Sequence, residues 1–459
     1  MRSEIRNQRL MIVIALSLVM MVIAVQIRLF AAADQVLPIN PRSPFVICTD
    51  DGTVVEVTGS IGTISTRDGE IVFDGVHTKY GVFLNSIGNV VNETHLCQGT
   101  VAYTHKDELM PETLSVMSGL HNFKPNSGTQ MTTTLLPGPQ QQPIYDAFGE
   151  YRGALFAYNY VTGEIYCMLS VPSAQSGSED DGYLLNRVRR TYTPGSTIKI
   201  AALVCALTQD PSLKDYTYTC SGVHKTPNGN EITCGNPHGK LSMAQAVGKS
   251  CNCYFASMIE KLDVDKTCDI LDELGIDSLG KYHNGYINNL SYTKGFAKFV
   301  NNTSGQHIWK LIGQGSEISL VDMARMAGAI VNGGSCAVPY IVESVYDPNE
   351  EIYTMSNPEA KMDPLISPDT AVVLKSIWTK AVEENYKKLD PRITVAKTGT
   401  AEYTDDTEKG EHHNRLLLGA IEEYNTAFML VVEGLPAGNS QIMDIANTLV
   451  QVLEGAQLS

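Results

Sequence analysis

The chain has 459 residues, which suggests two or three domains and allows a substantial hydrophobic core. Hydrophobic residues make up 43% and charged residues 18% of the chain, a globular composition that excludes a collagen-like, coiled-coil or disordered protein. The formal net charge of -16 would repel a phosphate backbone, so we expect no nucleic acid among its partners.

The first predicted element is a transmembrane anchor over residues 10–30. From Leu10 to Ile27 the chain carries no charged residue, which is long enough to cross a bilayer core. Three arginines precede this run, and the positive-inside bias then leaves residues 1–9 as a cytoplasmic stub. The alternative is a signal peptide cleaved at Ala31 to Ala33. The long apolar run favours a single-pass protein of the cell membrane whose folded part is extracytoplasmic.

Residues 34–148 predict a small, mostly extended domain. Short β-like runs alternate there with Asn and Gly turns. The segment closes in Leu136 to Pro139 and a run of three glutamines, which we interpret as a linker.

Residues 150–459 predict a second domain of the α+β class. Two strands open it, a block of helices follows, and three strands and a helix close it, which indicates one five-stranded antiparallel sheet flanked by helices, with an all-helical lobe. A cleft between sheet and lobe is the expected place of a site. The predicted strands are 153–160, 165–170, 393–397, 415–421 and 426–433, and the predicted helices are 197–208, 241–248, 253–262, 264–274, 319–332, 367–386 and 440–453.

Ten cysteines in an extracytoplasmic chain raise the question of disulfides. Cys220 and Cys234 bracket a polar, turn-rich stretch, and a bridge there would contribute about 3 kcal/mol by closing a loop of about 15 residues. Two free thiols are the open alternative. Cys48 and Cys97 are a weaker pair. No Cys/His spacing resembles a zinc site, so we expect no metal and no other cofactor.

Three S-x-x-K sequences occur, and their contexts differ. Ser278 has Gly280 inside a predicted turn, and Ser291 lies in an Asn- and Tyr-rich stretch without helical periodicity, so we expect both in surface loops. Ser196 instead opens an apolar helix, so that Lys199 lies on the same face one turn along. A buried lysine there would have a lowered pKa and could take the hydroxyl proton, while the helix N-terminus favours developing negative charge.

Two further signals follow along the chain. Ser250 and Asn252 form the only S-x-N sequence and interrupt a helical stretch, so a loop could direct both side chains into the cleft. Lys397, Thr398 and Gly399 form the only K-T-G sequence, at the predicted end of a strand, where the lysine can bind a carboxylate and the next N–H can serve an oxyanion hole. Taken singly, Ser196 could be only a helix cap, Ser250 with Asn252 only a helix break, and Lys397 to Gly399 only a strand end. The combination and order of the three motifs favour a catalytic site.

The three motifs in this order resemble those of the penicillin-binding proteins and serine β-lactamases. The resemblance extends over roughly residues 150–455. Besides the motifs it is carried by Arg152-Gly153-Ala154 through Ile165, Asn186-Arg187 before Tyr192 to Ser196, His238-Gly239, Ile312 to Gly315, and Val331 to Gly334.

The resemblance implies a role for each matched residue. Ser196 would be the acylated nucleophile, Lys199 its base, Ser250 a proton relay to the leaving group, and Asn252 a ligand of the substrate amide. Lys397 with Thr398 and Gly399 would bind the terminal carboxylate, and the N–H groups of Ser196 and Thr400 would form the oxyanion hole. The implied substrates are peptidoglycan stem peptides, attacked at their D-Ala-D-Ala bond, and β-lactams.

What precedes the second domain indicates the branch of the family. The stretch between the anchor and Arg152 is too short for a glycosyltransferase domain, so the chain resembles a monofunctional class B transpeptidase with a short N-terminal pedestal. Such pedestals commonly dock onto membrane partners that polymerise glycan in division, elongation or sporulation. The segment Met131 to Pro137 departs from the family's usual sequence, which leaves those partners open.

Three other functions remain open at this point. A β-lactamase would use the same serine but hydrolyse its acyl-enzyme quickly, and a D,D-carboxypeptidase would use water as the acceptor. A non-catalytic β-lactam-binding scaffold or sensor would need only the fold. The intact Ser196, Lys199, Asn252 and Lys397 disfavour the scaffold, and a nine-residue stub is too small to signal.

Overall fold

A computed structural model describes most of the chain after residue 60 and a few strands before it. The described residues are 45–48, 54–57, 62–74, 78–88, 90–91, 95–96, 100–109, 128–173, 186–281, 283–287, 290–299, 305–347, 352–355, 360–402, 412–436 and 438–456.

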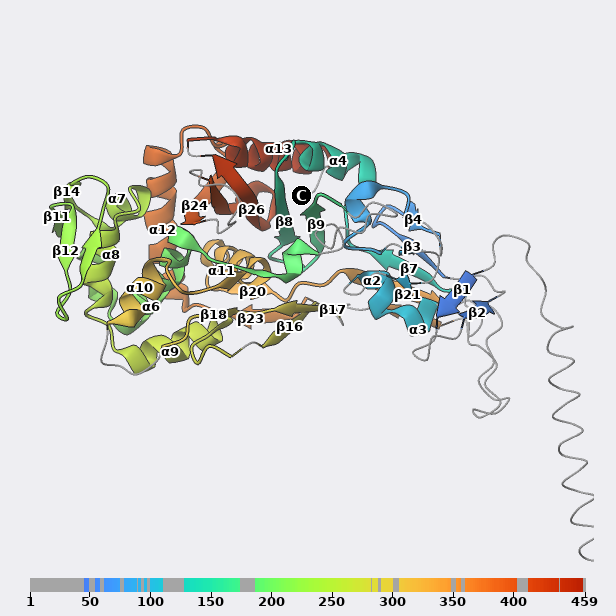
Figure 1. The fold of residues 1–459 in the computed structure, drawn as a ribbon, viewed down its shortest axis with the longest axis horizontal. Helices are drawn as coiled ribbons and strands as arrows, with labels where there is room; N and C mark the ends of the chain where they lie inside the picture. Colours follow the sequence, from blue (N-terminus) through green and yellow to red (C-terminus); the bar gives the residue numbers. More distant parts are fainter. Residues whose placement is uncertain are drawn as a thin grey trace, which may run out of the picture.

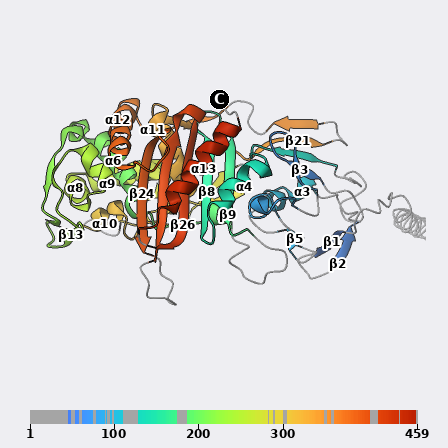
Figure 2. The same ribbon diagram turned by 90° about the horizontal axis from the view of Figure 1, so that it is seen from above.

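A five-stranded antiparallel sheet forms the centre of the molecule (Figures 1 and 2). Its spatial order is β24-β25-β26-β8-β9, so strands from both ends of the second predicted domain lie side by side. The predicted sheet is therefore confirmed. Its strands are β8 (Arg152–Asn159), β9 (Ile165–Val171), β24 (Ile393–Glu402), β25 (His412–Ile421) and β26 (Thr426–Pro436).

Helices cover both faces of this sheet, which is why its inner strands are buried along almost their whole length. Helix α11 (Leu320–Val331) packs on one face, against β8, β25 and β26. Helix α13 (Gln441–Gly455) packs on the other face and lies beside α4 (Gly138–Asp146). Ser319 caps α11 by accepting a hydrogen bond from the Asp322 N–H.

The helical lobe lies at one end of the central sheet (Figure 1). Its innermost helix, α6, is buried from Lys199 through Leu207, since other helices surround it. The lobe contains α6 (Lys199–Gln209), α7 (Met243–Gly248), α8 (Asn252–Ile259), α9 (Val264–Glu273), α10 (Gln306–Ile312) and α12 (Pro368–Asn385).

The lobe is not all-helical, which corrects the prediction. Two short ribbons pair within it, β11 with β14 and β12 with β13, where the sequence suggested only a polar stretch of turns. Each of these strands has only three residues, too few to show a period of two in the sequence. They are β11 (Tyr218–Cys220), β12 (Val223–Lys225), β13 (Glu231–Thr233) and β14 (Gly239–Leu241).

A second five-stranded sheet lies on the opposite side of the central sheet from the lobe (Figure 2). Its order, β22-β21-β7-β3-β4, joins early strands to two strands from beyond residue 340. The sequence did not predict that these late strands leave the second domain for this N-terminal sheet. Its strands are β3 (Thr63–Ser65), β4 (Ile71–Phe73), β7 (Gln130–Thr133), β21 (Val342–Asp347) and β22 (Ile352–Met355).

The predicted linker is wrong, because residues 138–146 form helix α4. Pro139 lies in the first turn, where a missing N–H costs nothing, and Pro143 lies further inside the helix. The Gln141 side chain is buried and donates a hydrogen bond to the Leu136 carbonyl at 2.6 Å. Gln441 of α13 binds the Ala147 carbonyl just after α4, at 2.8 Å. This segment is thus packed onto the transpeptidase-like half.

The remaining described elements are short. They are β1 (Phe45–Cys48), β2 (Val54–Val57), β5 (Val90–Val91), β6 (His95–Leu96), β10 (Thr191–Tyr192), β15 (Ile276–Asp277), β16 (Asn284–Ile287), β17 (Leu290–Thr293), β18 (Gly295–Phe296), β19 (Ile318–Ser319), β20 (Ser335–Ala337), β23 (Met362–Pro364), α2 (Val101–Thr104), α3 (Lys106–Leu109) and the 3-10 turns Gly81–Phe83, Arg187–Arg189, Gly195–Ile198, Pro211–Asp215 and Glu422–Tyr424.

Within the described part of the chain, no helix combines the length and apolar character needed to cross a membrane. The predicted anchor, residues 10–30, lies outside the described residues, as does Cys97 of the weaker cysteine pair.

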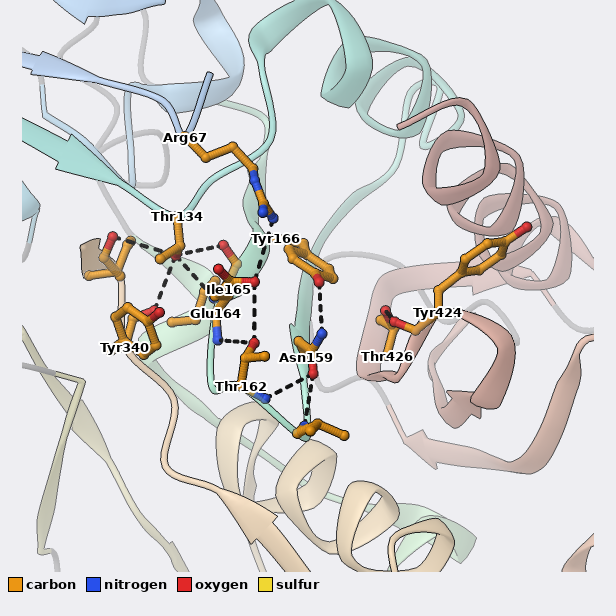
Figure 3. Close-up of polar contacts among 12 residues, drawn as sticks. Arg67, Thr134, Asn159, Thr162, Glu164, Ile165, Tyr166, Tyr340, Tyr424 and Thr426 are labelled. Carbon is orange, nitrogen blue, oxygen red and sulfur yellow. Dashed lines mark hydrogen bonds and ion pairs between the residues drawn. The ribbon is translucent and has the colours of Figure 1, made fainter. Parts of the chain in front are cut away.

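A buried polar junction joins the N-terminal sheet to the central sheet (Figure 3). The Thr134 hydroxyl donates to the Ile165 carbonyl at 2.9 Å and accepts from the Ile165 N–H at 3.1 Å. Nearby, Arg67 lies 3.6 Å from the Glu164 carboxylate and over the Tyr166 ring. One threonine therefore satisfies both backbone groups of Ile165 at the start of β9.

We expect Thr134→Val to lower the free energy of unfolding by about 1–3 kcal/mol. The substitution keeps the side-chain shape but leaves buried backbone groups with fewer partners. Chemical denaturation monitored by tryptophan fluorescence measures the change. Thr208→Val, on the exposed side of α6, is the matched control and is expected to change stability little. Equal effects of the two substitutions would contradict the role of this junction.

Candidate active site

The S-x-x-K pair lies at the start of α6, as predicted. Ser196 stands in the 3-10 turn Gly195–Ile198, and Lys199 is the first residue of the α-helix. A spacing of three residues brings the Lys199 Nζ to 3.0 Å from the Ser196 Oγ. The apolar helix buries the lysine completely, so this amine is held against the hydroxyl inside the protein.

Ser250 and Asn252, the S-x-N residues, also contact the Lys199 amine. Asn252 is the first residue of α8, and Ser250 lies between α7 and α8 with a positive φ of 52°, a conformation that costs a non-glycine residue about 1–3 kcal/mol. The Lys199 Nζ is 2.9 Å from the Ser250 carbonyl oxygen, 3.2 Å from its Oγ and 2.6 Å from the Asn252 Oδ1. The S-x-N turn thus surrounds the amine with oxygen atoms.

Lys397 of β24 completes the cluster. Its Nζ lies 3.1 Å from the Ser250 Oγ and 2.8 Å from the Thr398 carbonyl oxygen. The Ser250 hydroxyl therefore lies within hydrogen-bonding distance of both lysines. Strand β24 continues to Glu402, so the K-T-G sequence lies inside the strand and not at its end, which corrects the prediction.

Burial sets the protonation of the two lysines. Burial first, and then the neighbouring charge of Lys397, holds the pKa of Lys199 well below its ordinary value. Burial alone lowers the pKa of Lys397 to about 7. Among the described residues, no ion pair joins either lysine to a carboxylate, and the Phe255 ring lies beside Lys199, its centroid 5.2 Å from the Nζ. An uncharged Lys199 can accept the proton of Ser196.

Two glycines allow β24 to pack directly against the serine turn. A Cβ on Gly399 would lie 2.4 Å from the Pro194 carbonyl oxygen. A Cβ on Gly195, whose φ is +51°, would lie 2.8 Å from the Thr400 nitrogen. The backbone of the K-T-G strand therefore runs alongside Ser196, which places the Thr400 peptide next to the hydroxyl.

The side chains of Thr398 and Thr400 do not join the lysine cluster. Tyr386, at the end of α12, lies with its Oη 3.1 Å from the Thr398 Oγ1 and accepts the Thr398 N–H at 3.3 Å. Arg415 of β25 donates to the Thr400 Oγ1 at 2.7 Å. The sequence analysis missed both partners, since neither lies in a motif and only the sheet and α12 bring them near β24.

A cavity of about 350 Å³ opens beside Thr398. Its walls include Tyr386, Thr398, Gly399 and Arg415, with the start of α13 closing one side. The cavity offers a hydroxyl, a phenol and a guanidinium next to the K-T-G strand.

The cysteines near the site are free thiols. Cys220 and Cys234 are not bonded to each other, so the alternative of two thiols is the one that the structure has. The structure instead gathers Cys220, Cys234, His238 and Cys251 close enough to share a metal ion. Metal binding was not expected from the sequence, because the ligands lie on separate segments that only folding brings together.

The fold and the serine–lysine cluster define a serine-type acyl-transfer enzyme. Residues 153–448 match the family model of the penicillin binding protein transpeptidase domain. Since this match covers more than half of the sequence, the chain belongs to that family.

Relatives and solved structures agree with this assignment. The chain is 27% identical over 353 residues to the peptidoglycan D,D-transpeptidase PbpA of Mycolicibacterium smegmatis, an alignment that covers 67% of each protein. Its fold is similar to the D,D-transpeptidase domain of a peptidoglycan glycosyltransferase from Eggerthella lenta, with a TM-score of 0.70, 23% identity, and coverage of 87% and 100%. It is also similar to penicillin-binding protein A from M. tuberculosis in an imipenem acyl-enzyme complex, with a TM-score of 0.68, 20% identity, and coverage of 86% and 98%.

The lowered pKa of Lys397 predicts how stability depends on pH. Because the folded-state pKa of about 7 lies below the ordinary value of 10.5, the unfolded chain binds more protons between these values. The contribution of Lys397 to the free energy of unfolding therefore rises with pH across this window, by at most about 1.4 kcal/mol per unit.

Lys397→Met removes this contribution. We expect the difference in unfolding free energy, wild type minus variant, to increase from pH 7 to pH 10 in urea titrations. Lys380→Met changes an exposed lysine and is expected to give a flat difference. A flat difference for Lys397→Met as well would show that this lysine is not desolvated.

Proposed function

We propose that this chain is a membrane-anchored peptidoglycan D,D-transpeptidase that forms its acyl intermediate on Ser196. The observation that carries the proposal is the position of the buried Lys199 Nζ, 3.0 Å from the Ser196 Oγ and within reach of Ser250 and Asn252. Such an arrangement makes a hydroxyl nucleophilic without a histidine or a metal in the first step.

The first half-reaction acylates Ser196. Its Oγ attacks the carbonyl carbon of the D-Ala-D-Ala bond while Lys199 takes the hydroxyl proton. The N–H groups of Ser196 and Thr400 stabilise the oxyanion, which agrees with the contact between Gly195 and the Thr400 peptide. Ser250, between the two lysines, passes a proton to the departing D-alanine amine as the peptide bond breaks.

The second half-reaction transfers the acyl group to another stem peptide. The amine of that stem attacks the ester carbonyl carbon and loses a proton to Lys199, which passes it to the Ser196 Oγ as the ester C–O bond breaks. Asn252 binds the substrate amide, and Lys397 with Thr398 and Gly399 binds the terminal carboxylate. A β-lactam enters the same first step, since its ring amide replaces the scissile bond.

The N-terminal region gives the enzyme its place at the membrane. The anchor, residues 10–30, holds the chain in the cell membrane with residues 1–9 in the cytoplasm. Strands β3, β4 and β7 of the N-terminal sheet belong to the pedestal, residues 34–148, which raises the transpeptidase domain, residues 150–459, toward the wall. Its exposed surface would dock a membrane glycan polymerase or proteins of division, elongation or sporulation, and so affect cell shape.

The acceptor distinguishes the alternatives. Water in place of the amine would make the enzyme a D,D-carboxypeptidase, and rapid hydrolysis of a penicillin adduct would make it a β-lactamase. Transpeptidation is favoured because the relative PbpA, of which the chain covers two thirds, carries the name peptidoglycan D,D-transpeptidase.

Ser196→Ala is expected to abolish covalent labelling by fluorescent penicillin while the fold is kept. Full-length protein in mild detergent is incubated with the probe, and peptide mass spectrometry locates and times the adduct. Ser291→Ala, which changes the serine of another S-x-x-K sequence, is the matched control and should label as the wild type does. A folded Ser196→Ala protein that still forms the adduct would overturn the assignment.

The two lysines are expected to differ in their effect on acylation. Lys199→Ala removes the proton acceptor and should lower the second-order acylation rate about 1,000-fold or more. Lys397→Ala removes a binding contact and should lower it about 10- to 100-fold. Both rates are measured from the fluorescence of the penicillin adduct in samples quenched at set times. Equal losses of rate would contradict the separate roles.

A further inference from the structure

A second cluster of reactive side chains lies beside the active site and has no part in the acyl transfer. It consists of Cys220, Cys234, His238 and Cys251, whose possible ligand atoms all lie within 4.8 Å of one another. Cys220 and Cys251 are buried, while Cys234 and His238 are half-buried. A thiol-rich cluster closed off from most of the solvent is a typical environment for a structural metal ion.

The spacing between the ligand atoms fits a tetrahedron around zinc. With Zn–S near 2.3 Å and Zn–N near 2.05 Å, two sulfur ligands lie about 3.8 Å apart, and a sulfur and a nitrogen about 3.6 Å apart. The Sγ atoms of Cys234 and Cys251 are 3.7 Å apart. The Cys220 Sγ is 3.6 Å from the His238 Nδ1. Both distances match the edges of a zinc tetrahedron.

The two ribbons of the lobe hold these ligands in place. Pairing of β11 with β14 sets Cys220 opposite Gly239, the residue after His238. The Cys234 N–H donates to the Gly222 carbonyl at 2.9 Å, which ties the end of β13 to the turn after β11. The backbone at Cys220 and Cys234 is therefore fixed by hydrogen bonds that do not involve the metal.

Backbone N–H groups also point at two of the sulfurs. Gly222 and His238 donate to the Cys220 Sγ, and the Tyr254 N–H donates to the Cys251 Sγ at 3.4 Å. Such donors stabilise thiolates and orient metal ligands.

We infer that Cys220, Cys234, His238 and Cys251 bind one structural zinc ion. Each cysteine thiol loses its proton on binding, and the imidazole binds through its neutral nitrogen. Three sulfurs and one nitrogen fill all four positions, so the ion has no open position for water or substrate and does not react with either. Thiolates with an imidazole select zinc over the harder divalent cations.

The ion would support the catalytic S-x-N turn. Cys251 lies between Ser250 and Asn252, and Cys234 follows Thr233, whose carbonyl accepts the Asn252 Nδ2 at 3.1 Å. Zinc would link these two backbone segments and so hold Ser250 in its left-handed conformation. The four ligands are positioning residues in this respect, and this part of the inference rests on the proposed function.

Without zinc, an external disulfide could oxidise the same thiols, taking two electrons and two protons from them and leaving as two thiols. The Sγ atoms of Cys234 and Cys253 are 3.4 Å apart, close enough to form a disulfide after small movements. That bond would remove Cys234 from the metal site. Zinc and a Cys234–Cys253 disulfide are therefore mutually exclusive outcomes.

The direct test measures metal in the full-length protein. Purified in detergent without chelator, it should contain about one zinc per chain by elemental mass spectrometry. Cobalt exchanged into the site should give the thiolate charge-transfer absorption and visible bands of a tetrahedral Co²⁺ centre. Cys234→Ser and His238→Asn should reduce zinc to well under half of the wild-type content, whereas Cys268→Ser, a cysteine of α9, should keep it.

The wild-type measurements alone can overturn the inference, even where a variant fails to fold. The inference is wrong if the folded protein contains no zinc after incubation with zinc, or if cobalt gives no thiolate absorption. It is also wrong if mass spectrometry finds a Cys234–Cys253 disulfide in protein prepared under reducing conditions. Because metal content is read without a penicillin, its failure is separate from failure of the proposed function.

The positioning role has its own readout. Removal of zinc under reducing conditions should slow acylation of Ser196 about 10- to 100-fold, and added zinc should restore the rate. The Cys268→Ser protein serves as the control through the same cycle. Unchanged acylation in a zinc-free, reduced protein would leave a metal site but refute its link to the S-x-N turn.

Discussion

The structure of the active site depends on burying two lysines next to each other, with no carboxylate from the described part of the chain paired to either. Burial lowers the pKa of Lys199, so this lysine loses its charge more easily than an exposed lysine does. The nearby Lys397 lowers that pKa further. The Ser250 hydroxyl lies between the two amines and can donate to one while accepting from the other. A buried apolar helix, a strained turn and an edge strand of the central sheet must all meet for this arrangement to exist, which explains why the site lies between the sheet and the lobe.

Much of the central domain could be predicted because its signals are local. The motifs at Ser196, Ser250 and Lys397 mark a helix start, a helix break and a strand, and the structure brings all three together. Their roles follow from family resemblance, whereas their distances follow from folding alone. The side chains of Thr398 and Thr400 show the limit, since their partners Tyr386 and Arg415 reach β24 from elements that no short motif identifies.

The errors have equally physical causes. Glycines and prolines around residue 138 suggested a linker, yet proline is compatible with a first helical turn and α13 provides a surface on which α4 packs. The two ribbons of the lobe are too short to show a period in the sequence. The cysteine cluster escaped notice for a related reason, because its ligands lie on three separate segments and only strand pairing and a helix cap unite them.

The pairing of β21 with β7 has a consequence for how the molecule assembles. The sheet that contains residues 130–133 is complete only after residues 342–346 have been synthesised. The hydrogen bonds between these two strands join positions some two hundred residues apart in the chain. As the polypeptide emerges, β7 would expose an unpaired edge while the whole lobe is still being made. The N-terminal sheet therefore cannot fold completely before the second domain does. The two regions reach their folded state together.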